Sequence, residues 1–211
     1  MSFKRLVRWY WAKAESVVGY RILRTFPIVG PALQRTIGLI KRKPAFLTTA
    51  QYWEDRYRSG GNSGAGSYNR LAQFKSEVLN DFVQRNHVAS VIEFGCGDGA
   101  QLGLAEYPSY VGVDVSKSAI SMCRQRYGAD PSKIFFSVKK LPSDTRADLA
   151  LSLDVIYHLV EDGVFDTYMR RLFEAATRFV IIYSSNEDQP WTGKHVRHRN
   201  FSDWIERHSP T

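Results

Sequence analysis

The sequence predicts an α/β domain in which a mainly parallel β-sheet is flanked by helices. Short runs of β-branched and aromatic residues recur at Val91–Ile92, Tyr110–Asp114 and Phe179–Tyr183, as expected of buried strands. Segments with apolar residues at helical spacing separate these runs, and strands that alternate with helices form parallel sheets. A glycine-rich turn, Gly95–Gly99, directly follows the first run, and such a turn can bring backbone N–H groups against a nucleotide-like ligand.

Residues 1–43 precede this domain as a basic amphipathic arm. The chain has 211 residues and a net charge of +8, but the arm alone carries ten basic residues and one acidic residue. Bulky apolar residues recur in the arm at spacings of three and four, which predicts an amphipathic helix over about residues 2–25. Residues 44–211 are close to neutral and are expected to form the α/β domain. Pro44 disfavours helix in the residue before it and so marks the boundary.

Three roles stay open for the arm. A helix rich in Lys, Arg, Trp and Tyr suits a membrane interface, so peripheral membrane contact is one expectation. Packing against its own domain or a partner, with the charges solvated, is another. Nucleic acid is the least favoured ligand, because an enzyme that acts on nucleic acid would also carry basic residues around its cleft.

The composition favours a cytoplasmic protein. No stretch is long and apolar enough to span a bilayer, since two prolines and Arg35 interrupt residues 26–40. The N-terminus also lacks the apolar core and the small-residue cleavage site of a secretory signal. Cysteine occurs only at Cys96 and Cys123, which excludes a disulfide framework and favours a reducing compartment. The alternative is a cytoplasmic protein held peripherally at a membrane surface by its arm.

Helical spacing and short apolar runs predict the remaining elements. A glycine- and serine-rich loop at residues 59–67 separates the first two helices, and two more strands are expected at Ile134–Phe136 and Asp148–Leu153. The predicted helices are Thr49–Tyr57, Tyr68–Asn86, Ser118–Arg124 and Phe165–Ala176, with a short one around Phe201–Ile205.

The glycine-rich turn and the second strand carry the predicted ligand chemistry. Gly95, Gly97 and Gly99 alternate, which lets the backbone turn sharply and approach a ligand without an intervening Cβ atom. A helix expected from about Ala100 would point its N-terminal amides at the same crevice. Asp114 lies 19 residues after Gly95, near the offset at which a carboxylate accepts hydrogen bonds from a ribose.

Two kinds of enzyme share such a unit. The spacing Gly95-x-Gly97-x-x-Ala100 fits the dinucleotide fingerprint, which would make the protein an NAD-dependent oxidoreductase. The spacing Glu93-x-Gly95-x-Gly97-x-Gly99 instead resembles the first motif of the class I S-adenosylmethionine-dependent methyltransferases. The stretches Gly112–Ser116 and Asp148–Leu159 are similar to the second motif and the fourth-strand motif of that family, and they favour the methyltransferase.

The resemblance implies a Rossmann-like fold, S-adenosyl-L-methionine as the cofactor and S-adenosyl-L-homocysteine as the product. It also suggests that residues 59–67 form a lid, for which a plain linker is the alternative. The family often has an acidic residue after the third strand that meets the adenine, but this chain has Ser137 there. The residues expected to contact the cofactor are Glu93, Gly95, Cys96, Gly97, Gly99, Asp114, Val115, Ser137 and Asp154.

The chain after the fifth strand departs from the family pattern. The family usually closes its sheet with an antiparallel hairpin, but the residues after Tyr183 are polar and predict only the short helix named above. A sheet without these strands has an open edge, which invites pairing with another chain. We therefore expect association, with a homo-oligomer as one form of it.

The candidate catalytic residue is His158. Methyl transfer from a sulfonium needs an aligned acceptor and the exclusion of water, and it needs a general base only where the acceptor must lose a proton. His158 follows Asp154 by four residues and is the candidate base for an alcohol or phenol; a structural role is the alternative. No metal-ligand spacing is present, and neither is the Asn/Asp-Pro-Pro-aromatic signature of amino-methylating DNA enzymes. We expect a small-molecule or saccharide-type acceptor, with a cofactor-binding protein without turnover as the alternative.

Overall fold

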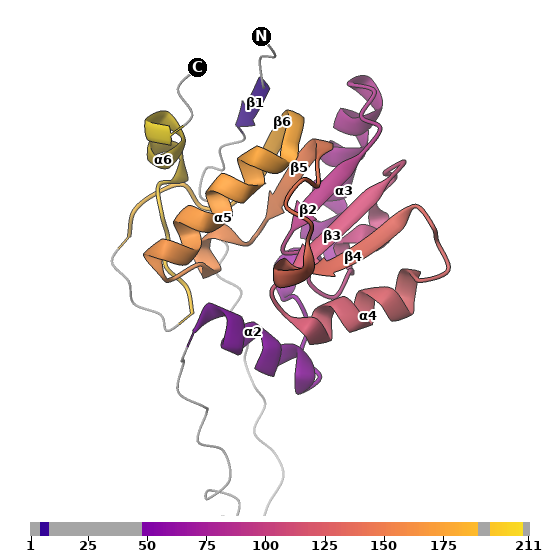
Figure 1. Cartoon of the computed structure of the whole chain (residues 1–211), viewed down its shortest axis with the longest axis horizontal. Helices are drawn as coiled ribbons and strands as arrows, with labels where there is room; N and C mark the ends of the chain where they lie inside the picture. The colour runs from indigo at the N-terminus through magenta and orange to yellow at the C-terminus, as the bar shows by residue number, and fades with distance from the viewer. Residues whose placement is uncertain (1–4, 9–47, 190–194, 209–211) are drawn as a thin grey trace, which may run out of the picture. The chain divides into compact units, whose positions relative to one another are not determined.

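The computed structural model describes residues 5–8, 48–189 and 195–208 (Figure 1). Residues 9–47, which include most of the expected amphipathic helix, lie outside the described part of the chain. The division into an arm over residues 1–43 and a domain over residues 44–211 stays a prediction. Among the described residues, no helix has the length and apolar character needed to cross a membrane.

Six parallel strands form one sheet in the order β1-β6-β5-β2-β3-β4. From β2 the chain proceeds outward through β3 to β4, and then crosses to β5 and β6 on the other side. The strand order therefore reverses at β2, and open α/β sheets bind ligands at the carboxyl ends of the strands beside such a reversal. The strands are β1 (Arg5–Arg8), β2 (Val91–Phe94), β3 (Tyr110–Asp114), β4 (Lys133–Ser137), β5 (Ala147–Leu153) and β6 (Ala176–Tyr183).

The five strands predicted from apolar runs are all present. They read as nearly continuous apolar segments because helices cover both faces of the sheet. In β5, the central residues Leu149, Ala150 and Leu151 have no exposed surface. The α/β fold with a mainly parallel sheet is confirmed.

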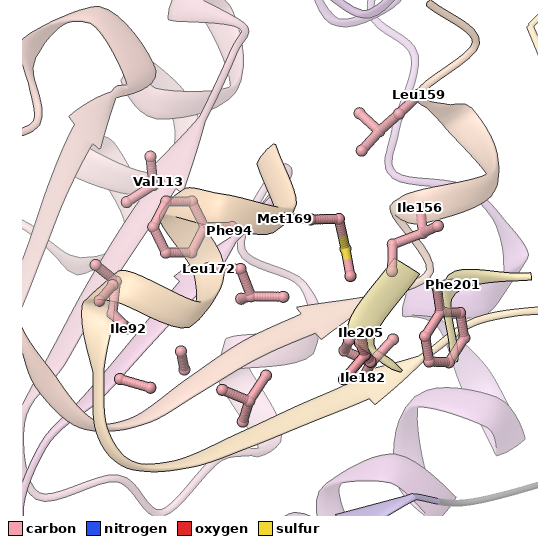
Figure 2. Close-up of a cluster of buried hydrophobic side chains, with 14 of the residues drawn as sticks. Ile92, Phe94, Val113, Ile156, Leu159, Met169, Leu172, Ile182, Phe201 and Ile205 are labelled. Atoms are coloured by element: carbon pink, nitrogen blue, oxygen red, sulfur yellow. The ribbon is translucent and has the colours of Figure 1, made fainter. Parts of the chain in front are cut away.

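The helices divide between the two faces of the sheet. Helices α5 (Asp162–Ala175) and α6 (Phe201–His208) pack on one face, where Figure 2 shows their side chains against those of β2, β3 and β6. Helices α3 (Asn69–Arg85) and α4 (Lys117–Tyr127) pack on the other. Helix α2 (Thr49–Arg58) contacts the start of α4 and lies near the carboxyl ends of the strands (Figure 1).

The expectation of a helix from about Ala100 is wrong. Only a single 3-10 turn, η2 (Gln101–Leu104), follows the glycine turn. Gly103 weakens helix formation inside this stretch, and Pro108 prevents a helix from continuing through it. The crevice therefore has the amides of the glycine turn but no long helix pointing its N-terminus at a ligand.

Residues 5–8 also depart from the expected N-terminal helix. They form β1, whose register with β6 runs from Arg5 opposite Phe179 to Arg8 opposite Ile182. This pairing satisfies backbone groups along the outer side of β6 that would otherwise be free. The edge that was predicted to be open is covered over these residues, and a homo-oligomer stays a prediction without support from β6.

Helix α6 packs where the sequence lacked a hairpin. In residues 184–189 and 195–208, the described part after β6, the structure has this helix and no strand. Trp204 contacts Phe165 and Phe173 of α5, with ring centroids 6.4 and 6.1 Å apart. Its indole Nε1 donates a hydrogen bond to Asp166 at 2.9 Å. The segment before α6 thereby returns toward the carboxyl ends of the strands.

Candidate active site

A cavity of about 580 Å³ opens at the carboxyl ends of β2, β3 and β5. Its volume is typical of sites for small molecules and cofactors. The glycine turn forms part of its wall, α2 and the loop after it cover it, and the first part of α5 closes the opposite side. Of the predicted site residues, those that line it are Gly95, Gly97, Asp114, Val115, Asp154 and His158.

The glycine turn fits against its neighbours without room for side chains. Gly95 and Gly97 have φ values of 90° and 57°, in the left-handed region that glycine adopts without strain. A Cβ atom at Gly95 would overlap the side chain of Val155, and one at Gly97 would overlap the hydroxyl of Ser63. The two glycines therefore let the turn lie between the end of β5 and the covering loop.

Asp114 lies at the end of β3 beside the glycine turn. Its Oδ2 accepts a hydrogen bond from the Gly97 amide at 3.0 Å, and its Oδ1 accepts one from the Ser116 amide at 2.8 Å. Burial raises the pKa of Asp114 to about 6, so the carboxylate is mostly ionised at neutral pH. Each oxygen keeps a second lone pair, so the group can still accept hydrogen bonds from the hydroxyls of a ribose.

The loop of residues 59–67 packs directly on the glycine turn. The carboxylate of Asp98 accepts hydrogen bonds from the Ser63 amide at 3.0 Å and from the Tyr68 hydroxyl at 2.6 Å. The hydroxyl of Ser63 in turn accepts from the Asp98 amide at 3.0 Å and lies 3.0 Å from the hydroxyl of Tyr57. This loop covers the turn, as a lid would, and the contacts that hold it are polar.

Asp154 ends β5 and faces the cavity, but it already has a cationic partner. The ammonium of Lys75 on α3 lies 2.6 Å from its Oδ2, and the Tyr157 hydroxyl donates to its Oδ1 at 3.1 Å. Asp154 has a φ of 59°, which is rare for a residue with a side chain and is often found at functional sites. A Cβ at Gly66 would lie 2.6 Å from Oδ2, so the covering loop also rests on this carboxylate.

Sequence reasoning missed Lys75. Its side chain is 3% exposed and lies on the same face of α3 as the buried residues Ala72, Leu79 and Val83. A lysine on the apolar face of an amphipathic helix was the available signal, because a buried lysine nearly always has an acidic partner. Only the fold shows that this partner is Asp154.

Four predicted cofactor contacts lie outside the cavity wall. Glu93 is buried behind the turn, where the Tyr110 hydroxyl donates to its Oε2 at 2.6 Å, and burial raises the pKa of Glu93 to about 7. Cys96 is also buried. The side chain of Ser137 does not reach the cavity, whereas the next residue, Val138, lines it. The residues outside the wall are Glu93, Cys96, Gly99 and Ser137.

Valine side chains form the end of the cavity beyond Asp114. Val115 follows β3, Val138 begins the 3-10 turn η3 (Val138–Lys140), and Val164 lies in the first turn of α5. The guanidinium of Arg171 donates to the Val138 carbonyl at 3.2 Å and fixes η3 against α5. A flat, mostly apolar ring system fits between such side chains.

His158 also lines the cavity, in the 3-10 turn η4 (Ile156–His158), together with Trp53 and Leu159. Its Nδ1 is 3.0 Å from the carbonyl oxygen of His195, and the Trp53 ring meets its ring edge to face at 4.9 Å. Burial lowers the pKa of His158 to about 4, so its imidazole is neutral at neutral pH. The structure thus brings the candidate base into the same cavity as the glycine turn.

Helix α2 forms one wall of the cavity, and none of its residues was among the predicted site residues. Thr49, Trp53 and Tyr57 line the cavity from this helix. The carboxylate of Glu54 accepts hydrogen bonds from the hydroxyls of Ser116 and Ser118 at 2.8 and 2.7 Å, which fastens α2 to the start of α4. The sequence shows the apolar and aromatic residues of α2, but it does not show that they face this cavity.

These residues fit S-adenosylmethionine. Gly95 and Gly97 bring backbone to the cavity wall, Asp114 offers an acceptor for ribose hydroxyls, and the valine side chains give the wall an apolar part for an adenine. Within the described residues, no group of His, Cys, Asp and Glu side chains is arranged to hold a metal ion.

Comparison with known proteins agrees with this reading of the site. Residues 92–181 match the model of a family described as a methyltransferase domain, and this stretch runs from β2 into β6. No curated protein matches the chain in sequence.

Solved structures share the fold. The magnesium protoporphyrin IX methyltransferase ChlM from Synechocystis PCC 6803 with bound S-adenosylhomocysteine is similar to this chain with a TM-score of 0.54 and 17% identity, over 74% of this chain and 84% of that one. The methyltransferase domain of the bacterial protein CtHen1-CN is similar with a TM-score of 0.50 and 22% identity, over 65% of this chain and 83% of that one. The family match covers the strands and the glycine turn of the cavity, so residues 92–181 form a methyltransferase domain, whose cofactor is S-adenosylmethionine.

Proposed function

We propose that this enzyme methylates a small-molecule or saccharide-type acceptor that enters the His158 end of the cavity. One observation carries the proposal: a single cavity reaches from the glycine turn to His158. Its glycine-turn end suits the cofactor, and its other end is lined by Trp53, His158 and Leu159. An acceptor there would lie next to the methyl group and would be shielded from water by α2 and the covering loop.

The residues of the cofactor end have separate roles in this proposal. The turn at Gly95 and Gly97 would adjoin the amino-acid part of the cofactor, and Asp114 would accept hydrogen bonds from the ribose hydroxyls. Val115 and Val138 would hold the adenine, in place of the side chain of Ser137. Asp154 would close the site from β5, with its orientation set by Lys75.

Direct titration of the protein with S-adenosylhomocysteine, beside NAD as the comparison ligand, is the test of this assignment. We expect saturable binding of S-adenosylhomocysteine and none of NAD. Asp114→Ala should weaken the binding of S-adenosylhomocysteine by at least about tenfold, because a charge-assisted hydrogen bond contributes roughly 1.5–3 kcal/mol. Unchanged affinity in that variant would contradict the role of Asp114.

The acceptor class is tested by turnover. Purified enzyme and radiolabelled S-adenosylmethionine are incubated with panels of hydroxylated small molecules, saccharides and amines, and label transfer is measured. We expect transfer to a member of the first two panels. Binding of the cofactor with no transfer to any panel would favour a binding protein without turnover.

For the N-terminal arm we propose peripheral contact with a membrane surface. The support is its charge and its aromatic content, as described above. The proposal is tested by co-sedimentation with anionic vesicles of the full chain and of a variant in which the ten basic residues of the arm are changed to Gln. Equal sedimentation of the two proteins would overturn it.

A further inference from the structure

The segment His195–Arg199 returns to the turn that carries His158 and bonds to its backbone. The Arg197 amide donates to the Tyr157 carbonyl at 2.8 Å. The Arg199 guanidinium donates to the carbonyls of Leu159 and Val160 at 3.2 and 2.9 Å. Three successive parts of the η4 region are thus held by a segment some 40 residues further along the chain.

An ion pair fastens this segment to α5. The guanidinium of Arg199 lies 2.6 Å from Oδ1 of Asp162, and that of Arg197 lies 3.0 Å from the same atom. Arg199 is 8% exposed, so its donors are committed to these partners rather than to water. The hydrogen bonds from Arg199 and Arg197 hold the pKa of Asp162 below its usual value.

The same segment determines which ring nitrogen of His158 carries the proton. The carbonyl oxygen of His195 can only accept a hydrogen bond, and it lies 3.0 Å from Nδ1 of His158. The proton of the neutral imidazole therefore lies on Nδ1, which leaves a lone pair on Nε2. Aromatic rings pack against both histidines. The Trp53 ring meets the His158 ring edge to face with centroids 4.9 Å apart, and the Tyr52 ring stacks on the His195 ring with centroids 4.4 Å apart.

The charges around His158 keep it neutral. The hydrogen bond to the His195 carbonyl and the charge of Asp154 at the end of β5 raise the pKa of His158, whereas the His195 ring and Arg56 on α2 lower it. The ring of Tyr157 packs beside that of His158, with centroids 4.5 Å apart. The carboxylate of Glu161 accepts hydrogen bonds from the amide and the hydroxyl of Thr49 at 2.9 and 2.6 Å. Burial is the largest influence, and it disfavours the imidazolium.

We propose that His195–Arg199 is a positioning segment that holds His158 as the Nδ1–H tautomer, so that Nε2 accepts the proton of a hydroxyl acceptor. This inference rests on the proposed function and narrows its acceptor to a neutral O–H group. A carboxylate has no proton to donate and would bring its own lone pairs against the lone pair of Nε2.

The proton transfer balances with the groups at hand. The bound cofactor supplies an electrophilic methyl group. The acceptor oxygen would form a bond to that carbon with one of its lone pairs, while the carbon–sulfur bond would break with its electron pair remaining on sulfur, so that S-adenosylhomocysteine would be the leaving group. The O–H bond of the acceptor would then break with its electron pair returning to oxygen. The proton passes to Nε2 of His158 and from there to water. A weak base suffices, because a hydroxyl oxygen that has gained a third bond is strongly acidic.

The tautomer can be measured on the protein without a substrate. Long-range ¹H–¹⁵N correlation spectra of the labelled full chain distinguish protonated from unprotonated ring nitrogens, and the signals of His158 are assigned by their loss in His158→Gln. At pH 7 we expect a protonated Nδ1 and an unprotonated Nε2, with titration only below about pH 5. An Nε2–H tautomer, or a titration midpoint near the ordinary histidine pKa of about 6.5, would overturn the proposal.

A charge-matched pair of variants tests the segment itself. In Arg199→Gln we expect water to reach the His158 ring, so that the loss of burial raises its titration midpoint toward the ordinary value, with partial recovery in Arg199→Lys. The control is Arg207→Gln, on the exposed side of α6, where the guanidinium donates to the nearby Asp203 carbonyl and the midpoint of His158 should not move. Arg197→Gln replaces Arg199→Gln if the latter does not fold.

Binding of S-adenosylhomocysteine to the same samples separates the two proposals. A shifted His158 titration with unchanged affinity for S-adenosylhomocysteine supports the positioning role. An unchanged titration in folded Arg199→Gln or Arg197→Gln overturns it while leaving the proposed function intact. Absence of S-adenosylhomocysteine binding in the wild type contradicts the proposed function, whatever the state of His158.

Discussion

The two ends of the cavity are built in different ways. The cofactor end comes mostly from one stretch of chain, residues 94–115, in which a strand, a glycine turn and a second strand follow one another. The His158 end is assembled from α2, η4 and residues 195–199, which are separated by up to about 150 positions. The first end can be recognised from local spacing, whereas the second exists only in the folded protein. Cofactor use therefore follows from the sequence motif, and acceptor choice follows from tertiary structure.

Lys75→Met should have the largest effect, because Lys75 and Asp154 join the two ends. Removal of the ammonium leaves the carboxylate of Asp154 without its cation in a largely buried place, which typically costs about 3–5 kcal/mol of folding free energy. Urea unfolding at pH 7 measures the loss. The double variant Lys75→Met/Asp154→Asn should recover most of it, since neither partner then carries a buried charge. A loss below about 1 kcal/mol in Lys75→Met would mean that the pair is not buried as described.

Gly97→Ala should disable the cofactor end alone. The new Cβ would overlap the Ser63 hydroxyl, and the backbone has a positive φ of 57°. Strain of this kind costs about 1–3 kcal/mol, so we expect the affinity for S-adenosylhomocysteine to fall by about 10- to 100-fold by calorimetric titration. The matched control is Gly163→Ala, where a Cβ meets no atom within 4 Å. Comparable affinity losses in the two variants would show that the glycine turn has no special role.

His158→Gln should affect the opposite end and change how stability depends on pH. The folded-state pKa of about 4 lies below the ordinary value of about 6.5, so the unfolded chain binds a proton at this position before the folded chain does. Wild-type stability therefore falls as the pH drops from about 6.5 toward 4, and this group contributes about 2 kcal/mol of that fall between pH 7 and pH 4.5.

The measurement compares urea unfolding of wild type and His158→Gln at pH 7 and pH 4.5. Relative to wild type, the variant should be more stable at pH 4.5 than at pH 7. Its affinity for S-adenosylhomocysteine at pH 7 should be unchanged, because the cofactor end is intact. A stability difference that does not vary with pH would show that His158 is not buried in its neutral form.

Glu93→Gln tests the support behind the glycine turn, at a residue that does not line the cavity. The folded pKa of about 7 lies above the ordinary value, so ionisation of Glu93 destabilises the folded chain as the pH rises from about 4.5 through 7. The variant should gain about 2 kcal/mol relative to wild type at pH 8 compared with pH 5. Urea unfolding at both pH values measures this gain. No gain at pH 8 would indicate that Tyr110 and Lys75 stabilise the ionised carboxylate fully.

The elements with strong local signals could be predicted from the sequence. The five strands from β2 to β6 and the helices α2 to α6 lie within a few residues of their predicted bounds, because apolar periodicity records burial directly. Asp114 faces the cavity as expected from its distance to Gly95. The helix expected after Ala100 is absent because Gly103 and Pro108 disfavour a helix there, although a helix follows the corresponding turn in dinucleotide-binding folds.

The remaining features depend on contacts between distant residues. The pairing of Arg5–Arg8 with β6 joins positions about 170 residues apart and has no local signal. The sequence shows a lysine on the apolar face of α3 at Lys75, but it does not show that Asp154 is the acidic partner. Ser137 ends β4 and does not line the cavity, whereas Val138, which begins η3, does, and a contact of Ser137 with the cofactor stays a prediction.

The return of residues 195–199 to η4 also bears on how this enzyme is made. Ribosomes extend a chain at about 5–20 residues per second, and the N-terminal parts of a protein emerge first. The sheet from β2 to β6 can form on the nascent chain as soon as residue 183 has left the ribosome. His158 gains its carbonyl partner only after His195 has followed. Completion of the His158 end therefore waits for a later part of the chain than completion of the strands around the glycine turn.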